Sequence, residues 1–567
     1  MQERVGQKSL GMLSWLKNYK RASLGGDISA GIIVALMLIP QGMAYAIVAG
    51  LPPVTGLYAS ILPPIAYALF GSSMVQSVGP QAITSLMIGA TLVTLGATGS
   101  PLGLALAAQM ALIAGVALLL CGVLRLGFLA NFLSRPVMSG FTAGTALSIA
   151  WGQVEMLLGG APMSPNLPSA EVGLGSLLLL WLAKRYLSKL LLRLGMNKNW
   201  ADISSKLAPV AVVGLATVAV GAFDLAAANV KIVGEIPSGL PAFSFAASSA
   251  HWHTLLVPSL LIAFIVFLSS QSAGQTLAQK RNERIHTNHE LLGLGAANLV
   301  SAVSGGFPVT GSISRSAVNY SAGANTPLAS IISSILLALL LVAPTAWLSM
   351  LPLPALAATI ILAVLGMIDL GDLKEAWRYD RGDAAAYLTA IGGVLILGIK
   401  EGVILGVMLS FATLIWRTSR PHMAVVGRIP GSEHFRNVER HNVETLPDVL
   451  MLRVDAGLFF GNAEAVVEQI ETLLAACVAQ DRQIHHVVMV MSAVNLIDTT
   501  ALHALRELNG TLGQSQIKLH LSEIKGPVMD RLQHSGLFKG ELSGQVFLST
   551  AQAYQSLSGA AEAENSY

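Results

Sequence analysis

Long apolar runs separated by short polar segments make up the first three quarters of the chain. No Asp, Glu, Lys, Arg or His occurs between Ile28 and Leu124, although a water-soluble fold of that length needs charged residues on its surface. A membrane-spanning helix needs roughly 17–25 mostly apolar residues. On this basis we expect fourteen membrane spans, near residues 28–48, 54–71, 80–97, 102–124, 128–147, 170–188, 207–223, 255–278, 290–304, 312–323, 326–344, 352–368, 384–399 and 401–418.

The distribution of basic residues predicts the orientation of these spans. Lys and Arg in short loops favour the cytoplasmic side of a membrane. With a cytoplasmic N-terminus, the loops after spans four, six, eight and twelve are cytoplasmic, and these loops carry most of the loop Lys and Arg. We therefore expect a multi-pass protein of the inner cell membrane with both termini in the cytoplasm. Residues 1–25 are predicted to be a cytoplasmic tail and residues 26–420 the transmembrane transport domain.

Composition excludes several functions. Only 11% of the 567 residues are charged, and 34 Lys and Arg against 31 Asp and Glu leave a net charge of +3, which is too small to predict a nucleic-acid partner. The spans contain no nucleophile–base pair and no pair of carboxylates, and the chain has no phosphate-binding P-loop, so we expect neither an enzyme nor an ATP-driven pump. His251 and His253 have no thiol or carboxylate partner, and no metal or other cofactor is predicted.

The pattern changes after about residue 430, where polar residues return and strand-like and helix-like segments alternate. Strands are expected at 449–454, 486–491, 517–522 and 545–549, with helices at 462–478, 499–512, 525–535 and 550–558. Such alternation is typical of a small α/β domain. We expect this domain over residues 441–558, after a linker at 421–440 and before a disordered tail at 559–567.

Two stretches interrupt the apolar pattern in a similar way. SVGPQAITSLMIG (77–89) opens the third span and GGFPVTGSISRSAVN (305–319) opens the tenth. If the fourteen spans form two inverted repeats of seven, these two spans are symmetry mates, and broken helices in matching positions are a pointer to a transporter's substrate site. Two helix N-termini that meet favour an anion, and Arg315 adds a full positive charge.

The same stretches carry a family resemblance. IPQGMAYAIVAGLPPVTGLYASILPP (39–64), QSVGPQAITSLMIG (76–89), VGEIPSGLP (233–241), the segment 288–319 and the C-terminal α/β segment resemble the sulfate permease (SulP) family. The resemblance implies an all-α domain of fourteen spans in a seven-plus-seven inverted repeat, with core and gate domains, and a cytoplasmic STAS domain. It also implies a homodimer and secondary active transport of small anions such as sulfate by an elevator-like mechanism. Bicarbonate or a dicarboxylate as the substrate, and a channel-like anion conductor, remain alternatives.

Carried over by motif, the family's anion site includes five residues of this chain. They are Gln41 and Tyr45 of the first span, Gln81 of the third span, and Ser314 and Arg315 of the tenth. Gln41 and Tyr45 are four residues apart and therefore share one helix face. Simpler roles stay open: Gln41 satisfying the backbone near Pro40, Tyr45 packing between helices, and Arg315 pairing with a carbonyl as part of the scaffold.

One departure from the family concerns the eighth span, where many bacterial relatives carry a carboxylate. Here Ser269 or Ser270 takes that place, and no other Asp or Glu is expected deep in a span. Direct Na⁺ coordination or proton transfer is then harder to explain, while exchange, uniport and a channel-like leak remain open. Ser269 and Gln271 are further candidates for the lining of the cavity.

The C-terminal domain offers one regulatory candidate. NLIDTTALHAL (495–505) resembles the loop that is phosphorylated in anti-sigma-factor antagonists, with Asp498 and Thr499 at the Asp-Ser position. A hydroxyl at a helix N-terminus also serves as an N-cap, and we favour that interpretation for Thr499. A regulatory partner of the STAS domain remains open.

Overall fold

The computed structural model describes residues 14–17, 19–128, 134–240, 243, 251–343 and 345–564, which divide into two compact units, one ending at Ser410 and the other beginning at Phe411. Most of the expected N-terminal tail, the first residues of the expected fifth span and residues 565–567 lie outside the described residues. Each of the fourteen apolar stretches contains a helix. The main helices of the first unit are α2 (Leu24–Val48), α3 (Pro53–Tyr58), α4 (Leu62–Phe70), α5 (Ala82–Thr94), α6 (Pro101–Val123), α7 (Arg135–Gly152), α9 (Leu167–Leu182), α12 (Ala208–Ala222), α13 (Trp252–Arg281), α14 (Thr287–Val303), α15 (Ile313–Ser321), α16 (Leu328–Val342), α18 (Leu353–Leu365) and α20 (Arg381–Leu397). Helix α21 (Ile399–Ser419) begins in the first unit and ends in the second.

Many of these helices are shorter than a full membrane span. Among the described residues, six helical segments are long and apolar enough to cross a bilayer by themselves, and a seventh is formed if the bent pair Trp200–Lys206 and Ala208–Ala222 is counted as one. Gly and Pro stand before one of the shorter helices, where Gly79 and Pro80 precede α5. The number of spans therefore stays a prediction.

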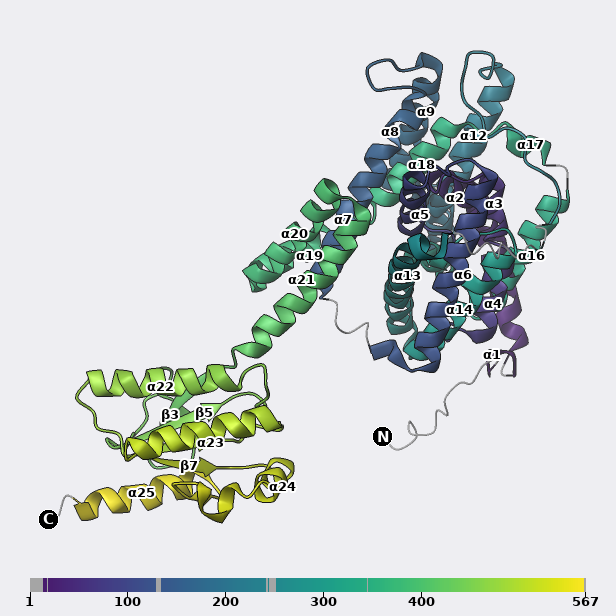
Figure 1. The fold of residues 1–567 in the computed structure, drawn as a ribbon. Coiled ribbons are helices and arrows are strands. Elements are labelled where there is room, and N and C mark those ends of the chain that lie inside the picture. The colour runs from purple at the N-terminus through teal and green to yellow at the C-terminus, as the bar shows by residue number, and fades with distance from the viewer. Residues whose placement is uncertain are drawn as a thin grey trace. The chain divides into compact units, whose positions relative to one another are not determined.

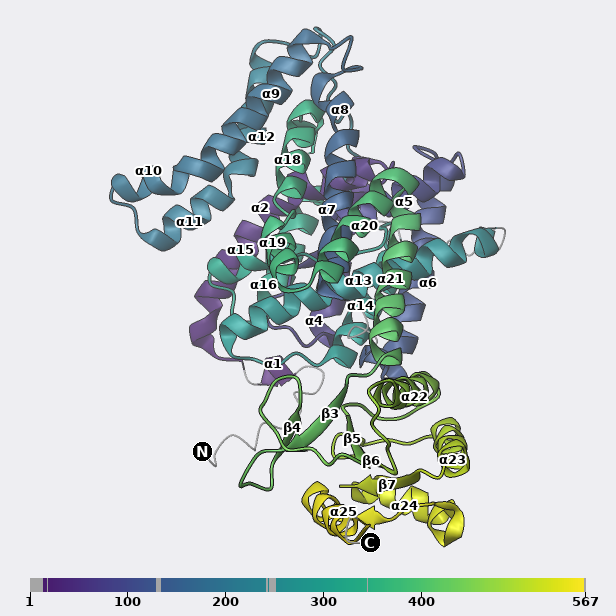
Figure 2. The same cartoon turned by 90° about the vertical axis from the view of Figure 1, so that its left-hand side faces the viewer.

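The helices of the first unit pack in two groups (Figures 1 and 2). In one group, α14 packs against α6 and α4, α16 against α2, and α13 against α6 and α15. In the other, α20 packs against α7, and α18 against α7 and α9. Helix α2 belongs to the first group and also contacts α12 and α18 of the second, so it lies where the two groups meet.

Two short strands bring the interrupted stretches together. β1 (Val78–Gly79) pairs antiparallel with β2 (Thr310–Gly311). Each strand is followed at once by a helix, α5 after β1 and α15 after β2. Because the strands are antiparallel, the two helices leave the ladder from opposite ends and both N-termini lie beside it.

Side chains of neighbouring helices hold the approach to β2 in place. Asn298 of α14 donates to the carbonyl of Val309 at 3.0 Å and accepts from its N–H at 2.9 Å. Thr310 donates to the carbonyl of Val266 on α13 at 2.8 Å. A buried non-helical backbone needs such partners because no water satisfies its polar groups.

The second unit contains a six-stranded sheet in the order β4-β3-β5-β6-β7-β8. The strands β5 to β8 are parallel, and β3 is antiparallel to β5. Their bounds, with those of the accompanying helices, are β3 (Met423–Arg428), β4 (Phe435–Asn437), β5 (Val449–Val454), α22 (Ala463–Ala479), β6 (His486–Val490), α23 (Thr499–Gln514), β7 (Lys518–Ser522), α24 (Gly526–His534), β8 (Val546–Phe547) and α25 (Thr550–Glu564).

Two boundaries of this domain were predicted wrongly. The expected linker at 421–440 contains β3 and β4, and β3 packs its apolar side chains Ala424 and Val426 into the sheet core. The six residues of β3 form a strand through their pairing with β5, a long-range contact that the local pattern did not show. Helix α25 does not end at residue 558 but continues to Glu564.

Candidate anion site

Arg315 lies between the two interrupted stretches. It is in the first turn of α15, and only 1% of its surface is exposed. Its Nε donates to the hydroxyl of Ser77 at 3.3 Å, and its Nη1 donates to the carbonyl of Pro80 at 2.8 Å. Both acceptors flank β1, before α5, whereas Arg315 follows β2. The guanidinium therefore connects the two interrupted stretches.

One nitrogen of the Arg315 guanidinium is left without a partner. Nη2 is buried and has no hydrogen-bonding partner among the described residues. A Cβ built at Gly79 would lie 3.2 Å from it, so a larger residue at position 79 would crowd the space beside this donor. A buried unpaired donor costs about 1–3 kcal/mol, and more when it is charged, so the position calls for a ligand that accepts hydrogen bonds.

The N-terminus of α5 offers further donors. Gln81 is its N-cap residue, but the side chain of Gln81 does not cap the helix. The Gln81 amide oxygen instead accepts from Ser269 of α13 at 3.1 Å, and its amide nitrogen has no partner in the described part of the chain. Among the described residues, the first N–H groups of α5 therefore have no capping side chain, and a helix N-terminus of this kind attracts negative charge.

A single face of α2 lies opposite these groups. Leu38 is 3.7 Å from a Cβ built at Gly79, and the buried side chain of Tyr45 lies near Arg315. Gln41 lies between them on the same helical face, three residues after Leu38 and four before Tyr45. It is half-buried, and its amide has no hydrogen-bonding partner among the described residues.

Ser314 lies beside Arg315 but has a different environment. Ser314 and its neighbour Ile313 are exposed, whereas Arg315 and Ser316 are buried. The N-cap residue of α15 is Ser312, whose hydroxyl accepts from the Arg315 N–H at 3.4 Å and lies 3.3 Å from the hydroxyl of Ser314. The first turn of α15 is thus open on one side and closed around Arg315 on the other.

The structure therefore brings together Tyr45, Gln81, Ser269 and Arg315, with Gln41 and Ser314 at the edges, but it places Gln271 elsewhere. The Gln271 amide donates to Thr287, at the start of α14, at 3.1 Å and bonds none of the predicted site residues. Ser270 is completely buried and is bonded by Gln76. Successive residues of a helix differ by about 100° in direction, so Ser269 faces Gln81 while Ser270 and Gln271 face other helices.

Sequence reasoning missed the residues that hold Arg315. Ser77 and the Pro80 carbonyl accept from its side chain, and the Ser77 N–H donates to the hydroxyl of Ser316 at 2.9 Å. All of them are in the two interrupted stretches, so the run of small polar residues around each Gly was the available signal.

Two completely buried carboxylates stand at the starts of helices, one just before an expected span and one at its first residue, so neither lies deep in an expected span. Glu290, in the first turn of α14, is completely buried and accepts from the Tyr67 hydroxyl at 2.6 Å, the Ser72 N–H at 2.9 Å, the Ser72 hydroxyl at 2.6 Å and the Ser73 N–H at 3.0 Å. Asp27, in the first turn of α2, is also completely buried and accepts from two N–H groups and a hydroxyl at residues 325–326. Both fasten a loop to a helix N-terminus, and neither bonds a predicted site residue.

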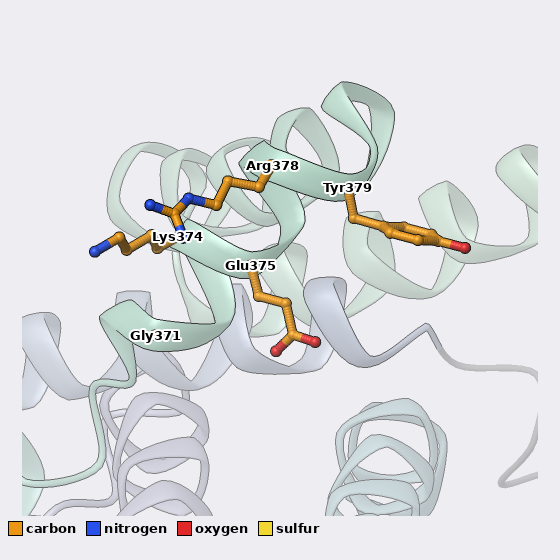
Figure 3. Close-up of a pocket in the computed structure, with 5 residues that line it drawn as sticks. All are labelled: Gly371, Lys374, Glu375, Arg378 and Tyr379. Carbon is orange, nitrogen blue, oxygen red and sulfur yellow. The ribbon is translucent and has the colours of Figure 1, made fainter.

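A separate surface cavity of about 450 Å³ lies on α19 (Leu370–Tyr379). It is lined by Gly371, Lys374, Glu375, Arg378 and Tyr379. Lys374 and Arg378 extend to the same side of the helix, and Glu375 and Tyr379 point away from them (Figure 3). All five residues are on one helix and exposed, so an anion here would stay in contact with water, unlike one beside Arg315.

In the second unit, Asp498 and not Thr499 caps α23. The Asp498 carboxylate accepts from the Ala501 N–H at 2.8 Å and from the Phe460 N–H at 2.8 Å. Thr499 is the first helical residue and is exposed. The N-cap interpretation was thus right for the helix but wrong about the residue, because the carboxylate reaches the free N–H groups from one position earlier.

Comparison with known proteins identifies a family model that matches each of the two units. The model of the sulfate permease family matches residues 24–390, and that of the STAS domain matches residues 440–553. Sulfate transporter 4.1, chloroplastic, from Arabidopsis thaliana is 34% identical over 547 residues, which cover 92% of this chain and 78% of the relative. A probable sulfate transporter of Mycobacterium tuberculosis is 34% identical over 544 residues, which cover 95% of this chain and 96% of the relative.

A solved structure shows the same fold. Murine Slc26a9, an anion transporter captured in an inward-facing state, matches this chain with a TM-score of 0.84 and 22% identity, over 95% of this chain and 93% of its own. The helical membrane domain followed by a STAS domain with a mixed sheet is thus the fold of both proteins. The relatives named above are transporters and not enzymes.

Proposed function

This chain belongs to the sulfate permease family of multi-pass membrane transporters, and on that premise we propose that it is a secondary active transporter of small anions such as sulfate. The anion is held between the N-termini of α5 and α15. The observation that carries the proposal is the buried Nη2 of Arg315, which has no hydrogen-bonding partner among the described residues and lies beside the N-terminus of α5, which no side chain of its N-cap residue caps. The names of the two relatives support sulfate as the substrate.

The chemistry of binding follows from these donors. Arg315 Nη2 and the first N–H groups of α5 supply hydrogen bonds to an oxyanion, and charge-assisted bonds of this kind are about twice as strong as neutral ones. Gln41 and Ser314 supply neutral donors at the edges, and Tyr45 covers the site from α2. An anion that leaves water for this site exchanges its hydration shell for donors that are already oriented, so little further ordering is required.

The movement that we propose is elevator-like. The group of helices that contains α5, α13 and α15 acts as the core domain, and the group of α7, α9, α18 and α20 acts as the gate domain. Support comes from the packing, in which each group is joined mainly within itself and α2 lies at the border. The β1–β2 ladder ties the two half-helices together, so both would move with the bound anion.

We further propose a homodimer in the inner cell membrane with both termini in the cytoplasm, and a regulatory partner for the STAS domain. The basic loops support this orientation through the preference of Lys and Arg for the cytoplasmic side.

Counterflow in proteoliposomes tests the substrate and the mechanism together. Vesicles loaded with unlabelled sulfate should accumulate labelled sulfate from outside, and unlabelled bicarbonate, chloride or succinate inside should drive less. Greater uptake with bicarbonate or succinate would assign the alternative substrates. Sulfate flux without any transient accumulation would instead indicate a channel-like conductor.

A further inference from the structure

The segment between α9 and α12 forms a basic hairpin at the end of two apolar helices. We define the basic hairpin as residues 183–206, which contain the π-helical turn Ala183–Leu187, α10 (Ser188–Arg193) and α11 (Lys198–Lys206). Helix α9 runs through this turn into α10 as one segment of 27 residues, Leu167–Arg193. Since about 20 residues cross a bilayer, the last turns of this segment emerge at the level of the lipid headgroups.

The second helix of the basic hairpin, α11, also stays at the level of the lipid headgroups. Helix α11 packs against α10 and the π-helical turn, as Figure 2 shows. It then bends by 51° into α12. Because both ends of the hairpin continue directly into apolar helices, chain connectivity holds it at the membrane surface.

The charge of the basic hairpin is strongly positive. It contains six basic residues and one acidic residue, Asp202, which gives a net charge of 6 − 1 = +5. Asp202 pairs with Lys206 at 2.8 Å. The other five basic side chains are exposed and have no hydrogen bond or ion pair in the described part of the chain: Lys184, Arg185, Lys189, Arg193 and Lys198.

Large apolar side chains are exposed among these charges. Leu194 and Trp200 are 73% and 57% exposed, and Tyr186 and Leu190 are also exposed. A helix that mixes Lys and Arg with exposed Leu and Trp is typical of segments that lie in the membrane interface. There the apolar side chains leave water and the basic ones meet phosphate groups.

We propose that the basic hairpin binds the headgroups of anionic phospholipids. Four to eight Lys and Arg directly beside a membrane helix are the pattern that attracts acidic lipids. The bilayer surface is the occupant that fits best, because it is anionic, it is adjacent by chain connectivity, and it covers Leu194 and Trp200 as well as the charges.

The basic hairpin is also linked to the anion site. Lys206 donates to the hydroxyl of Ser321 at 2.8 Å, and Ser321 is the last residue of α15, the helix that begins beside Arg315. Lipid binding at the hairpin would therefore favour one position of α15, and transport should respond to the acidic-lipid content of the membrane.

A charge-matched pair of variants tests the proposal. Lys189→Gln/Arg193→Gln removes two exposed charges four residues apart on α10. The control, Lys374→Gln/Arg378→Gln, removes two exposed charges with the same spacing on α19. The control lies in a segment, residues 369–383, with three basic and five acidic residues and a net charge of 3 − 5 = −2.

The measurement is native mass spectrometry of the full-length protein from mixed micelles of phosphatidylglycerol and phosphatidylcholine with the same acyl chains. We expect the unmodified protein and the α19 variant to retain phosphatidylglycerol preferentially. The α10 variant should lose at least threefold of that preference, and added salt should reduce it further.

Three results would overturn the proposal. One is equal phosphatidylglycerol retention by both variants. Another is displacement of the lipid by millimolar inorganic phosphate, which would make the hairpin a site for free anions. The third is a change in the number of protein copies in the complex of the α10 variant, which would show that a second copy of the chain covers this surface.

Discussion

Arg315 and Glu290 are both buried charged side chains in the first turn of a helix, but their surroundings differ. Four hydrogen bonds from Tyr67, Ser72 and Ser73 saturate the Glu290 carboxylate, and the N-terminus of α14 favours its negative charge. Arg315 has the opposite sign at the same kind of helix end, and its Nη2 has no partner among the described residues.

On the proposed function, this difference distinguishes a structural charge, Glu290, from a substrate-binding one, Arg315. Burying a charge costs several kcal/mol unless hydrogen bonds and counter-charges replace water. At Glu290 the protein supplies them itself, so the carboxylate stabilises the fold. At Arg315 the described residues supply no counter-charge and no acceptor for Nη2, and an anion could provide both. The predictions below test this distinction.

The largest effect is expected at Glu290. Glu290→Ala leaves two N–H groups and two hydroxyls without an acceptor, and we expect the free energy of unfolding to fall by about 3–5 kcal/mol. The fraction of monodisperse protein and its thermal unfolding in detergent would measure this. Glu290→Gln keeps one acceptor oxygen and should be less damaging. An alanine variant as stable as the unmodified protein would contradict a structural role for Glu290.

The converse variant, Arg315→Met, should spare the fold and remove transport. Losing one partner of a buried charge-assisted contact costs about 2–5 kcal/mol of binding, so sulfate affinity and uptake should collapse. Thermal stability in the absence of substrate should change little, because the loss of the bonds to Ser77 and Pro80 is offset by the removal of a buried charge. Arg135→Met, at a position whose side chain is 78% exposed, is the matched control and should leave uptake intact.

A negative charge placed near Arg315 should have an intermediate effect. Ser269 bonds Gln81 and lies close to the ladder. Ser269→Glu brings a carboxylate to this place, and we expect anion affinity to fall about tenfold near neutral pH, which corresponds to about 1.4 kcal/mol. Ser269→Gln, of similar size and no charge, separates charge from bulk.

A related prediction concerns cation coupling in the unmodified protein. In the described part of the chain no carboxylate bonds Gln81, Ser269 or Arg315, so the unmodified protein should transport with no stoichiometric Na⁺ requirement. Saturable activation by Na⁺ that K⁺ and choline do not reproduce would contradict this expectation.

His520, in the second unit, is a third buried titratable group, and it avoids the cost of burying a charge by staying neutral. Burial, together with His486 and Lys518, lowers the pKa of His520 from its usual 6.5 to about 4. His520 Nδ1 accepts from the Gln545 N–H at 3.0 Å, beside the β7–β8 pairing, and protonation would remove this acceptor.

The smallest predicted effect follows from this lowered pKa. The unfolded chain takes up the proton as pH falls through 6.5, whereas the folded domain takes it up only near pH 4. Stability is therefore complete above pH 6.5, declines between pH 6.5 and 4, and should already be lower by roughly 1 kcal/mol at pH 6 than at pH 7.5. Urea unfolding of a fragment beginning at residue 420 would measure this, and His520→Asn should weaken the pH dependence.

Much of the fold was predictable from the sequence because its signals are local. The apolar runs marked helices such as α6, and the breakers Gly79 and Pro80 marked the start of α5. Strand β5 was expected at 449–454 and lies at Val449–Val454. In contrast, β3 is recognised only through its pairing with β5, a long-range contact that no local pattern contains.

The candidate anion site was predictable only in part, because its contacts join residues that are far apart in the sequence. Arg315 was conspicuous as a charge in an apolar region, but its partners Ser77 and Pro80 precede it by more than 230 residues. Glu290 stands at the boundary of its apolar stretch, so sequence gave no measure of its burial. Gln271 was misplaced because a helix face cannot be assigned from spacing when two polar neighbours, Ser269 and Ser270, compete for it.

The β1–β2 ladder pairs two nearly equivalent backbones, but their charges are unequal. Arg315 stands four residues after Gly311, and the equivalent place, four residues after Gly79, is taken by Ile83. The ladder thus presents a single positive charge from its two halves. With a monovalent anion the loaded site is neutral, and with a divalent anion it retains one negative charge. A membrane potential should therefore act on the movement of a sulfate-loaded site, by about 2.3 kcal/mol per 100 mV for a full crossing, and leave a bicarbonate-loaded one unaffected.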